Sequence, residues 1–326
     1  MSKYKPGAYR NYLRFSKKKH ILVEGKEDKI AITFLLNEMA DNTNLRISNI
    51  AIESAEQIIS PDGKKVGNRD KVLNIASSIT EKDYKFRFLG FVDRELDGFE
   101  IESSVIEDKV RRHRIDGRVL FSRGHSVENY LFEISILGLI LQGQSTIPFS
   151  NKVLRMFEEV FEDALHQSCA LGLAASDLEL LGKIKKSIKW NFFNIDSQSN
   201  LLFLVDDWIS ETKSQRKISD EISDLFKARF FFYLEKLRLS EEMLPRWLCH
   251  GHMGLDFLYA VYCACLVKVA IQSGYSEQSP TSHIDWVGRD KLFTLLAKLW
   301  AKKALEGNCE YPEEIAKILN ISAEIR

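Results

Sequence analysis

The 326-residue sequence lacks the features that would assign it to a specialised class of protein. Lysine plus arginine and aspartate plus glutamate both number 46, so the net charge identifies no partner. The five cysteines include no CxxC pair, and an odd set of unpaired thiols is typical of a reducing compartment. We find no apolar core of a signal peptide, no internal repeat and no low-complexity tract. With 45% apolar residues, a globular cytoplasmic protein with a full core is expected.

Long apolar runs are also scarce. Ile134–Leu141 is far shorter than the roughly 20 apolar residues that cross a bilayer. Phe257–Ile271 is longer but contains Lys268, so it predicts a buried helix and not a membrane span.

The first 130 residues alternate between strand and helix patterns. Short apolar runs predict strands, and apolar residues at helical spacing predict helices between them. The expected strands are 20–24, 45–52, 86–92 and 118–121, and the expected helices are 26–40, 68–79 and 100–114. This order predicts a mainly parallel sheet with helices on both faces.

After about residue 130 the strand signals fade and helical spacing dominates. The expected helices are 153–173, 178–190, 219–239, 254–272, 289–305 and 312–319, with a polar loop at 206–218. We therefore predict an α/β domain over residues 1–130, with a basic N-terminal arm, followed by an all-helical domain over 131–326. The helical domain is expected to serve dimerisation or partner docking.

Acidic residues follow two of the predicted strands. His20–Val23 runs into Glu24-Gly25, with Asp28 one helical turn further on, and Phe88–Val92 runs into Asp93, Glu95 and Asp97. Acids at the carboxyl ends of parallel strands are candidates for a site. The alternatives are a first-turn acid at Asp28 and a solvated turn at Asp97-Gly98. If the strand continues past Asp93, its alternate acids share one side.

A further acid, Glu128, follows the last strand in the sequence Ser126–Leu131. Ser126 is also a candidate helix N-cap, with Glu128 as a first-turn acid. Clustered carboxylates repel one another unless a divalent cation neutralises them, and hard oxygen ligands suit Mg²⁺ or Mn²⁺. The predicted metal ligands are Glu24, Asp28, Asp93, Glu95 and Glu128.

These motifs are similar to those of a known domain family. An EGxxD motif after the first strand and an Asp-x-acid motif after a later strand resemble the TOPRIM domain of topoisomerases, bacterial primases, recombination mediators and overcoming-lysogenization-defect nucleases. The resemblance implies a Rossmann-like sheet with a Mg²⁺- or Mn²⁺-dependent site that acts on phosphodiesters. It implies catalytic roles for Glu24, Asp93 and Glu95. Glu95 stands where the family has a second Asp, and its longer side chain would shift the position of a bound metal.

The combination of VEGKEDK, VDRELD and SVENYL is similar to a family of TOPRIM-like bacterial proteins with a helical C-terminal half. These proteins are the toxic effectors of anti-phage defence loci such as the PARIS system, beside an ABC-type ATPase. Trp247–Leu258 resembles a Gly-His segment of the same family. The resemblance implies a nuclease effector of abortive infection that cleaves RNA such as tRNA, with the ATPase as partner and a homodimer as a further option.

Several cations are candidates for contacting substrate. Lys26, Arg94 and Arg123 neighbour the acids, and the run Arg111–Arg114 is more typical of a solvated helix face. Residues 1–20 hold seven Lys or Arg, no acid and four interleaved aromatic residues. This segment either packs its aromatic rings on the core or binds phosphates as an arm.

Other functions remain open. A TOPRIM fold can serve as a non-catalytic nucleic-acid-binding module in repair or recombination, and a DNA nuclease of the overcoming-lysogenization-defect type is another alternative. The three retained acids favour catalysis. A topoisomerase would need an active-site tyrosine and further domains, and a primase would bring a zinc module. Cys249-His250-Gly251-His252 has no spacing typical of structural zinc.

Overall fold

The computed structural model describes residues 4–42, 46–60, 66–79, 86–101, 104–216, 218–275, 284 and 288–318. The chain forms two compact units. Unit 1 comprises Met1–Glu95, Val110–Tyr130 and Phe293–Arg326, and unit 2 comprises Leu96–Lys109 and Leu131–Leu292. One boundary between the units follows Tyr130, where the predicted domains also meet. Residues 96–109 and 293–326, however, lie in the opposite unit from the predicted one.

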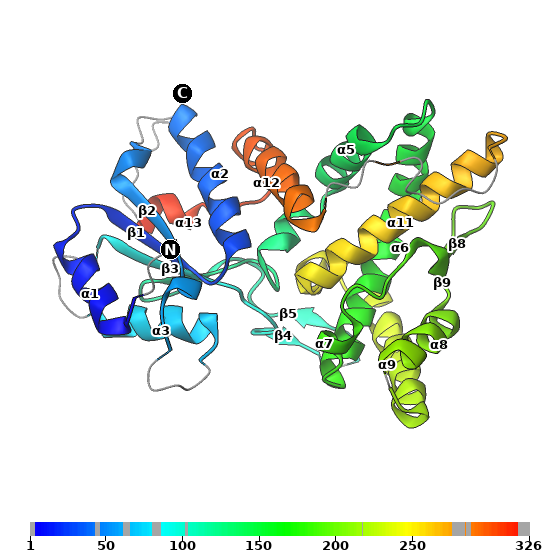
Figure 1. The fold of residues 1–326 in the computed structure, drawn as a ribbon, viewed down its shortest axis with the longest axis horizontal. Coiled ribbons are helices and arrows are strands. Elements are labelled where there is room, and N and C mark those ends of the chain that lie inside the picture. The colour runs from blue at the N-terminus through cyan, green and yellow to red at the C-terminus, as the bar shows by residue number, and fades with distance from the viewer. Residues whose placement is uncertain are drawn as a thin grey trace. The chain divides into compact units, whose positions relative to one another are not determined.

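Unit 1 is built on a five-stranded sheet (Figure 1). The strand order is β2 (Ile50–Ser54), β1 (Lys19–Val23), β3 (Phe88–Val92), β7 (Val119–Phe121) and β6 (Arg114–Asp116). The first four strands are parallel and β6 is an antiparallel edge. The predicted α/β class with a mainly parallel sheet is confirmed.

Helices cover both faces of this sheet because its buried strands alternate apolar side chains between the two faces. Leu22, Phe88 and Val92 face one apolar cluster with residues of α1 (Pro6–Phe15) and α3 (Asn68–Ser78). The other face is covered by α2 (Lys26–Asn42), whose inner side is buried (Figure 1). Gly90 lets α3 approach β3, since a Cβ there would lie 2.8 Å from Val72 Cγ1.

The C-terminal segment returns to unit 1 through α12 (Arg289–Leu305) and α13 (Glu314–Ile318). The Trp300 ring packs on Tyr130 with centroids 5.4 Å apart, and its indole N–H donates to the Glu310 carbonyl at 3.0 Å. His113 lies beside Glu314 on α13, with 3.4 Å between Nδ1 and Oε2. These contacts explain why this segment belongs to the α/β unit and not to the helical one.

Unit 2 is mainly helical. Its centre is α6 (Ser150–Asp177), which packs against α9 (Asp220–Arg238) and α11 (Gly251–Gln272). The remaining helices are α5 (Ile134–Gln144), α7 (Leu181–Ile184), α8 (Val205–Arg216) and α10 (Leu244–Leu248). By length and composition α11 could cross a membrane, but 78% of its most apolar window is buried in the protein. This agrees with the predicted buried helix.

Two predicted helices and one predicted strand were wrong or displaced, and one hairpin was not predicted. The predicted helix at 100–114 is replaced by β4 (Phe99–Glu100), β5 (Glu107–Asp108) and the start of β6, where Gly98 at φ 76° begins a hairpin. The predicted helix at 178–190 shrinks to α7. An unpredicted hairpin of β8 (Phe193–Ile195) and β9 (Leu201–Phe203) follows. The strand expected at 45–52 begins only at Ile50, and residues 43–45 lie outside the described ones.

The polar segment 206–218, predicted as a loop, is instead the helix α8. Val205, Trp208 and Thr212 share a buried face at spacings of three and four residues. Acids in its first turn and Lys213 and Arg216 in its last turn suit the helix dipole. Three buried residues are therefore enough to hold a helix whose composition is otherwise polar.

Candidate functional site

Two of the predicted acids meet where β1 and β3 end. These strands are parallel neighbours, with Val23 opposite Phe91, so the residues that follow them lie at one edge of the sheet. Glu24 Oε1 accepts the backbone N–H of Asp93 at 2.8 Å. On the other side, Ser54 at the end of β2 donates its hydroxyl to the Glu24 carbonyl at 3.2 Å. Glu24 is thereby fixed at the carboxyl ends of the three neighbouring strands β2, β1 and β3.

Asp28 lies in the first turn of α2 and is buried. Its Oδ2 accepts the N–H of Gly25 at 2.8 Å, the residue just before the helix. An acid that reaches back to an N-terminal N–H stabilises the helix start. The role of Asp28 as a first-turn acid, which was considered from the sequence, is therefore confirmed. It occupies only one carboxylate oxygen, and the side chain still faces the other acids.

The loop after β3 is held against the loop after β7. The Arg94 N–H donates to Ser122 Oγ at 2.9 Å, and the Glu95 N–H donates to the His125 carbonyl at 2.8 Å. A third bond runs from Arg94 Nη1 to the Arg123 carbonyl at 2.9 Å. The 3₁₀ helix η4 (Val127–Leu131), which carries the buried Glu128, begins a few residues further on. The three bonds therefore bring the end of β3 and the start of η4 to the same place.

The electrostatics show that these acids face one another. Burial raises the pKa of Glu24 to about 7, although the Asp93 N–H lowers it, and the charge of Glu95 raises it further. Burial likewise raises the pKa of Asp28 to about 7, with added repulsion from Glu128 and Glu24. The pKa of Asp93 is raised by burial and by the charges of Asp28, Glu24 and Glu128. We call these four residues, Glu24, Asp28, Asp93 and Glu128, the acid cluster.

The acid cluster contains an unsatisfied atom. Asp93 Oδ1 is buried and has no hydrogen-bond partner among the described residues. A buried carboxylate oxygen in that state is costly, because it has lost water and gained no donor. Protons or a bound cation would relieve both this loss and the repulsion among the acids.

The two remaining acids of the DRELD motif lie apart from the acid cluster. The strand ends at Val92, and Glu95 has φ 54°, so the expected alternation along a continued strand was wrong. The Glu95 side chain is 55% exposed and its Oε2 lies 3.9 Å from Arg69 Nη1 on α3. Asp97 is exposed and belongs to unit 2. Glu95 therefore stands at the rim of the acid cluster, within electrostatic reach of Glu24.

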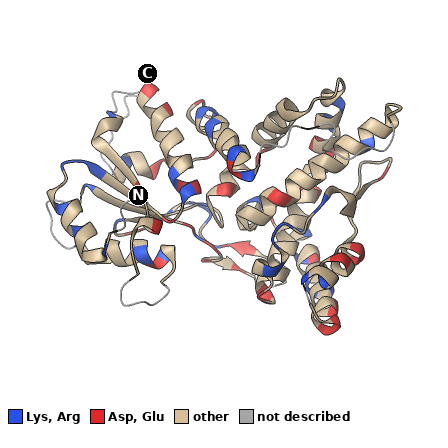
Figure 2. Ribbon diagram, viewed as in Figure 1, with Lys and Arg blue, Asp and Glu red and all other residues tan. Residues whose placement is uncertain are grey.

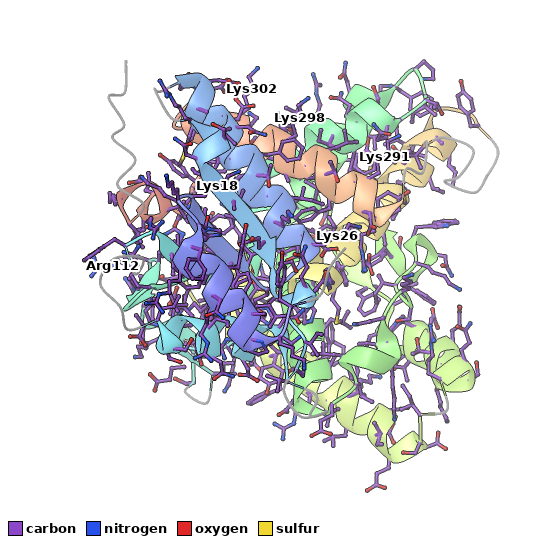
Figure 3. All side chains as sticks on the ribbon, turned by 60° about the vertical axis from the view of Figure 1, so that its left-hand side comes forward. Lys18, Lys26, Arg112, Lys291, Lys298 and Lys302 are labelled. Carbon is purple, nitrogen blue, oxygen red and sulfur yellow. The ribbon has the colours of Figure 1, made fainter. Side chains whose placement is uncertain are left out.

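The three predicted substrate-binding cations differ sharply in exposure. Lys26 is exposed at the first position of α2, directly after the site loop (Figure 3). Arg94 is only 1% exposed and binds the Arg123 carbonyl, which conflicts with a role in binding substrate and makes it a positioning residue. The Arg123 side chain is 12% exposed and its Nε lies 3.4 Å from Glu310 Oε1. Only Lys26 is placed as expected for a substrate contact.

The basic N-terminal segment packs on the sheet over part of its length. Tyr9 and Leu13 of α1 are buried in the core, while Phe15 is 81% exposed. The Tyr9 hydroxyl donates to Glu53 Oε2 at 2.7 Å, and His20 Nδ1 lies 3.0 Å from the same oxygen. This geometry supports the core-packing interpretation for Tyr4 and Tyr9 but not for Phe15, and it leaves the lysines and arginines of the segment untested.

Several site residues carry no motif in the sequence. Ser54 and Ser122 orient the loops that hold Glu24 and Asp93, and Arg69 and Asp70 of α3 act on the pKa of Glu24. Each serine directly follows or ends a strand, which is the signal that could have identified it. None of the five cysteines is in a disulfide, and four of them are buried.

The acid cluster, the buried Arg94 and the rim residue Glu95 define the site by geometry alone. A scan against protein-family models and a search of curated proteins find no match for this chain.

Proposed function

We propose that this chain is a divalent-metal-dependent nuclease that cleaves phosphodiester bonds at the acid cluster. The observation that carries the proposal is the convergence of four carboxyl groups at one sheet edge, with a buried Asp93 Oδ1 that has no hydrogen-bond partner among the described residues and with raised pKa values at Glu24, Asp28 and Asp93. A fold that retains such a costly arrangement gains from it when a cation binds. The resemblance to TOPRIM domains supports the same chemistry.

Asp28, Asp93 and Glu128, with Glu24, are the residues that would hold Mg²⁺ or Mn²⁺, because all four offer hard oxygen ligands. As the described side chains stand, no three His, Cys, Asp or Glu groups are arranged as a finished metal site. Binding would therefore draw the carboxylates together. When bound, the ion would stabilise charge on the phosphoryl oxygens and lower the pKa of a bound water.

Glu24 is suited to proton transfer. Burial raises its pKa to about 7, so both protonation states are populated near neutral pH, as general acid–base catalysis requires. The Asp93 N–H holds one of its oxygens in place at 2.8 Å. Asp93 is fixed in turn by the loop bonds of Arg94 and Glu95. Glu24 therefore combines a suitable pKa with a fixed position.

The substrate and the biological role in this proposal rest on the resemblance to the TOPRIM-like effectors of the PARIS system. The chain would act as the toxic effector of a bacterial anti-phage defence system and cleave RNA such as tRNA. An ABC-type ATPase would restrain it until a trigger arrives, and unit 2 offers a large surface for that contact.

The test is a cleavage assay on tRNA and on duplex DNA with Mn²⁺, Mg²⁺ or EDTA, with the partner ATPase present and absent. Sequencing of RNA and DNA ends after expression in cells identifies the substrate. Glu24→Gln is the inactive variant. Glu56→Gln is the matched control, because Glu56 is an exposed acid in the 3₁₀ helix η2 (Ala55–Gln57) that follows β2.

The proposal predicts metal-dependent cleavage that Glu24→Gln removes and Glu56→Gln keeps. Binding of nucleic acid without metal-dependent cleavage in any arm would instead identify a non-catalytic module. Failure of the chain to co-purify with the ATPase at mild salt would contradict the partner but leave the nuclease standing.

A further inference from the structure

One face of α12 carries only positive charge. Lys298 and Lys302 are four residues apart and Lys291 precedes Lys298 by seven, so helical periodicity places all three side chains on one face. All three are exposed. Figure 2 shows Lys and Arg residues along α12, and Figure 3 shows the three labelled lysines following one another along this helix. Lys298 and Lys302 lie in unit 1, as the acid cluster does, whereas Lys291 lies in unit 2. We call Lys298 and Lys302 the lysine row.

The lysine row is not explained by the stability of the helix. In the described part of the chain none of its members forms an ion pair. Like charges four residues apart, as at Lys298 and Lys302, destabilise a helix by a few tenths of a kcal/mol. The helix dipole favours Lys302 in the last turn but does not remove the repulsion between Lys302 and Lys298. A ligand of opposite charge would offset these costs.

The opposite face of α12 fixes the helix to the element that carries part of the acid cluster. Leu296, Ala297 and Trp300 are completely buried. The Trp300 ring packs on Tyr130, which lies in η4 two residues after Glu128. Lys298 and Lys302 therefore project from a helix that is anchored, within unit 1, on the same short element as a proposed metal ligand.

We propose that the lysine row binds the phosphodiester backbone of the nucleic acid that the acid cluster cleaves. The inference rests on the proposed function. It narrows the substrate class to a nucleic-acid polymer long enough for several of its phosphates to reach the lysine row. Lysines bind phosphates as point charges, without base specificity. An anionic membrane is a poorer fit, because the apolar face of α12 is buried and leaves nothing to insert between lipids.

The experiment measures binding separately from cleavage. All proteins carry Glu24→Gln, and fluorescence anisotropy follows their binding to labelled single-stranded RNA and to labelled duplex DNA over a range of salt. The test variant is Lys298→Glu/Lys302→Glu. The control is Lys152→Glu/Arg155→Glu on α6, two exposed cations with the same change in charge, where Glu158 and Glu159 follow one turn on.

We expect the test variant to bind at least about tenfold more weakly and to lose about 1.4 from the salt slope on RNA, which corresponds to two phosphate contacts. The control stays close to the unmodified protein. The conservative Lys298→Arg/Lys302→Arg variant keeps its affinity, which separates lost charge from lost fold. The arm that binds more tightly identifies RNA or DNA as the source of the phosphates.

Equal binding by the test variant and the control overturns the inference, and so does a protein that binds neither nucleic acid. Tighter binding to phosphatidylserine vesicles than to either polymer overturns it in favour of a membrane. A parallel cleavage assay uses the same lysine variants with Glu24 retained. A protein that binds nucleic acid through the lysine row but does not cleave it with Glu24 retained contradicts the nuclease and leaves the lysine row standing. Cleavage by a Lys298→Glu/Lys302→Glu protein that binds as tightly as the unmodified one overturns the lysine row and leaves the nuclease standing.

Discussion

Two partly buried acids of neighbouring strands in unit 1, Glu53 and Glu24, have pKa values that shift in opposite directions. Burial alone would raise the pKa of Glu53 on β2. Hydrogen bonds from His20 and Tyr9 outweigh burial, so the pKa is lowered overall. Glu24 follows the adjacent strand, and its pKa is raised to about 7 because burial outweighs the single Asp93 N–H. Burial raises the pKa of both acids, so burial alone does not explain why the two pKa values shift in opposite directions.

The difference lies in their partners. Glu53 is held by the Tyr9 hydroxyl at 2.7 Å and by His20 Nδ1 at 3.0 Å, and this network joins α1 to the sheet. The acid cluster has other acids as neighbours and a buried Asp93 Oδ1 with no donor among the described residues. Two side-chain partners stabilise the charged form of Glu53. Glu24, Asp28 and Asp93 each accept a backbone N–H but repel one another until a cation or a proton neutralises them.

The largest expected effect is on cleavage. Glu24→Gln keeps the size of the side chain and an oxygen for the Asp93 N–H but removes its charge and its proton transfer. We expect the cleavage rate to fall by about a hundredfold or more and toxicity in cells to disappear. The free energy of unfolding should change little or rise, because one of several repelling carboxylates is gone. Unaltered toxicity, or an unfolded variant, would refute this role for Glu24.

Glu53 should show the reverse pattern. Glu53→Leu removes the acceptor and leaves the Tyr9 hydroxyl and His20 Nδ1 without it. We expect the free energy of unfolding, measured by urea titration, to fall by about 2 kcal/mol. Cleavage per folded molecule should stay near the unmodified level. A stable Glu53→Leu variant that has lost cleavage would show that Glu53 and the acid cluster are not functionally distinct.

A smaller effect is expected in the pH dependence of stability in EDTA. Burial raises the folded-state pKa of Glu24 to about 7, so the folded state binds protons more tightly than the unfolded state. Stability from this group is present at low pH and is lost as the pH rises toward 7. His113 acts oppositely, since burial and Arg123 lower its pKa to about 4 and its contribution is lost on acidification.

Subtracting the free energy of unfolding of Glu24→Gln from that of the unmodified protein cancels the contribution of His113. That difference should decline between about pH 4.5 and pH 7 in urea titrations. Mn²⁺ should flatten the decline, because a cation favours the charged carboxylates. A difference that grows with pH would mean that Glu24 has a stabilising cationic partner.

The parts of the site that the sequence predicted are those set by strand order. Short apolar runs ending in Glu24 and Asp93 were sufficient, because the carboxyl ends of neighbouring parallel strands meet. Asp28 and Glu128 followed from helical spacing and from their position after a strand. The α/β class was predicted in the same way, from buried strands alternating with helices.

The parts that the sequence did not predict depend on contacts distant in the chain. The burial of Arg94 is set by Ser122 and by the Arg123 carbonyl, almost 30 residues further on. The left-handed backbone of Glu95 turned a predicted ligand toward Arg69. The return of α12 to unit 1 depends on Trp300 meeting Tyr130, and no local pattern records such a contact.

Calorimetric titration with Mn²⁺ tests the central claim most directly, that the acid cluster is a metal site with Glu95 at its rim. Asp93→Asn removes a charge from within the acid cluster, and Glu95→Gln removes the same charge from an exposed side chain a short way along the same loop. We predict that Asp93→Asn weakens Mn²⁺ binding by about tenfold or more, because losing even a residue that only supports a ligand typically costs about tenfold in metal affinity. Glu95→Gln should change Mn²⁺ binding far less. Unchanged Mn²⁺ affinity in Asp93→Asn would contradict the account.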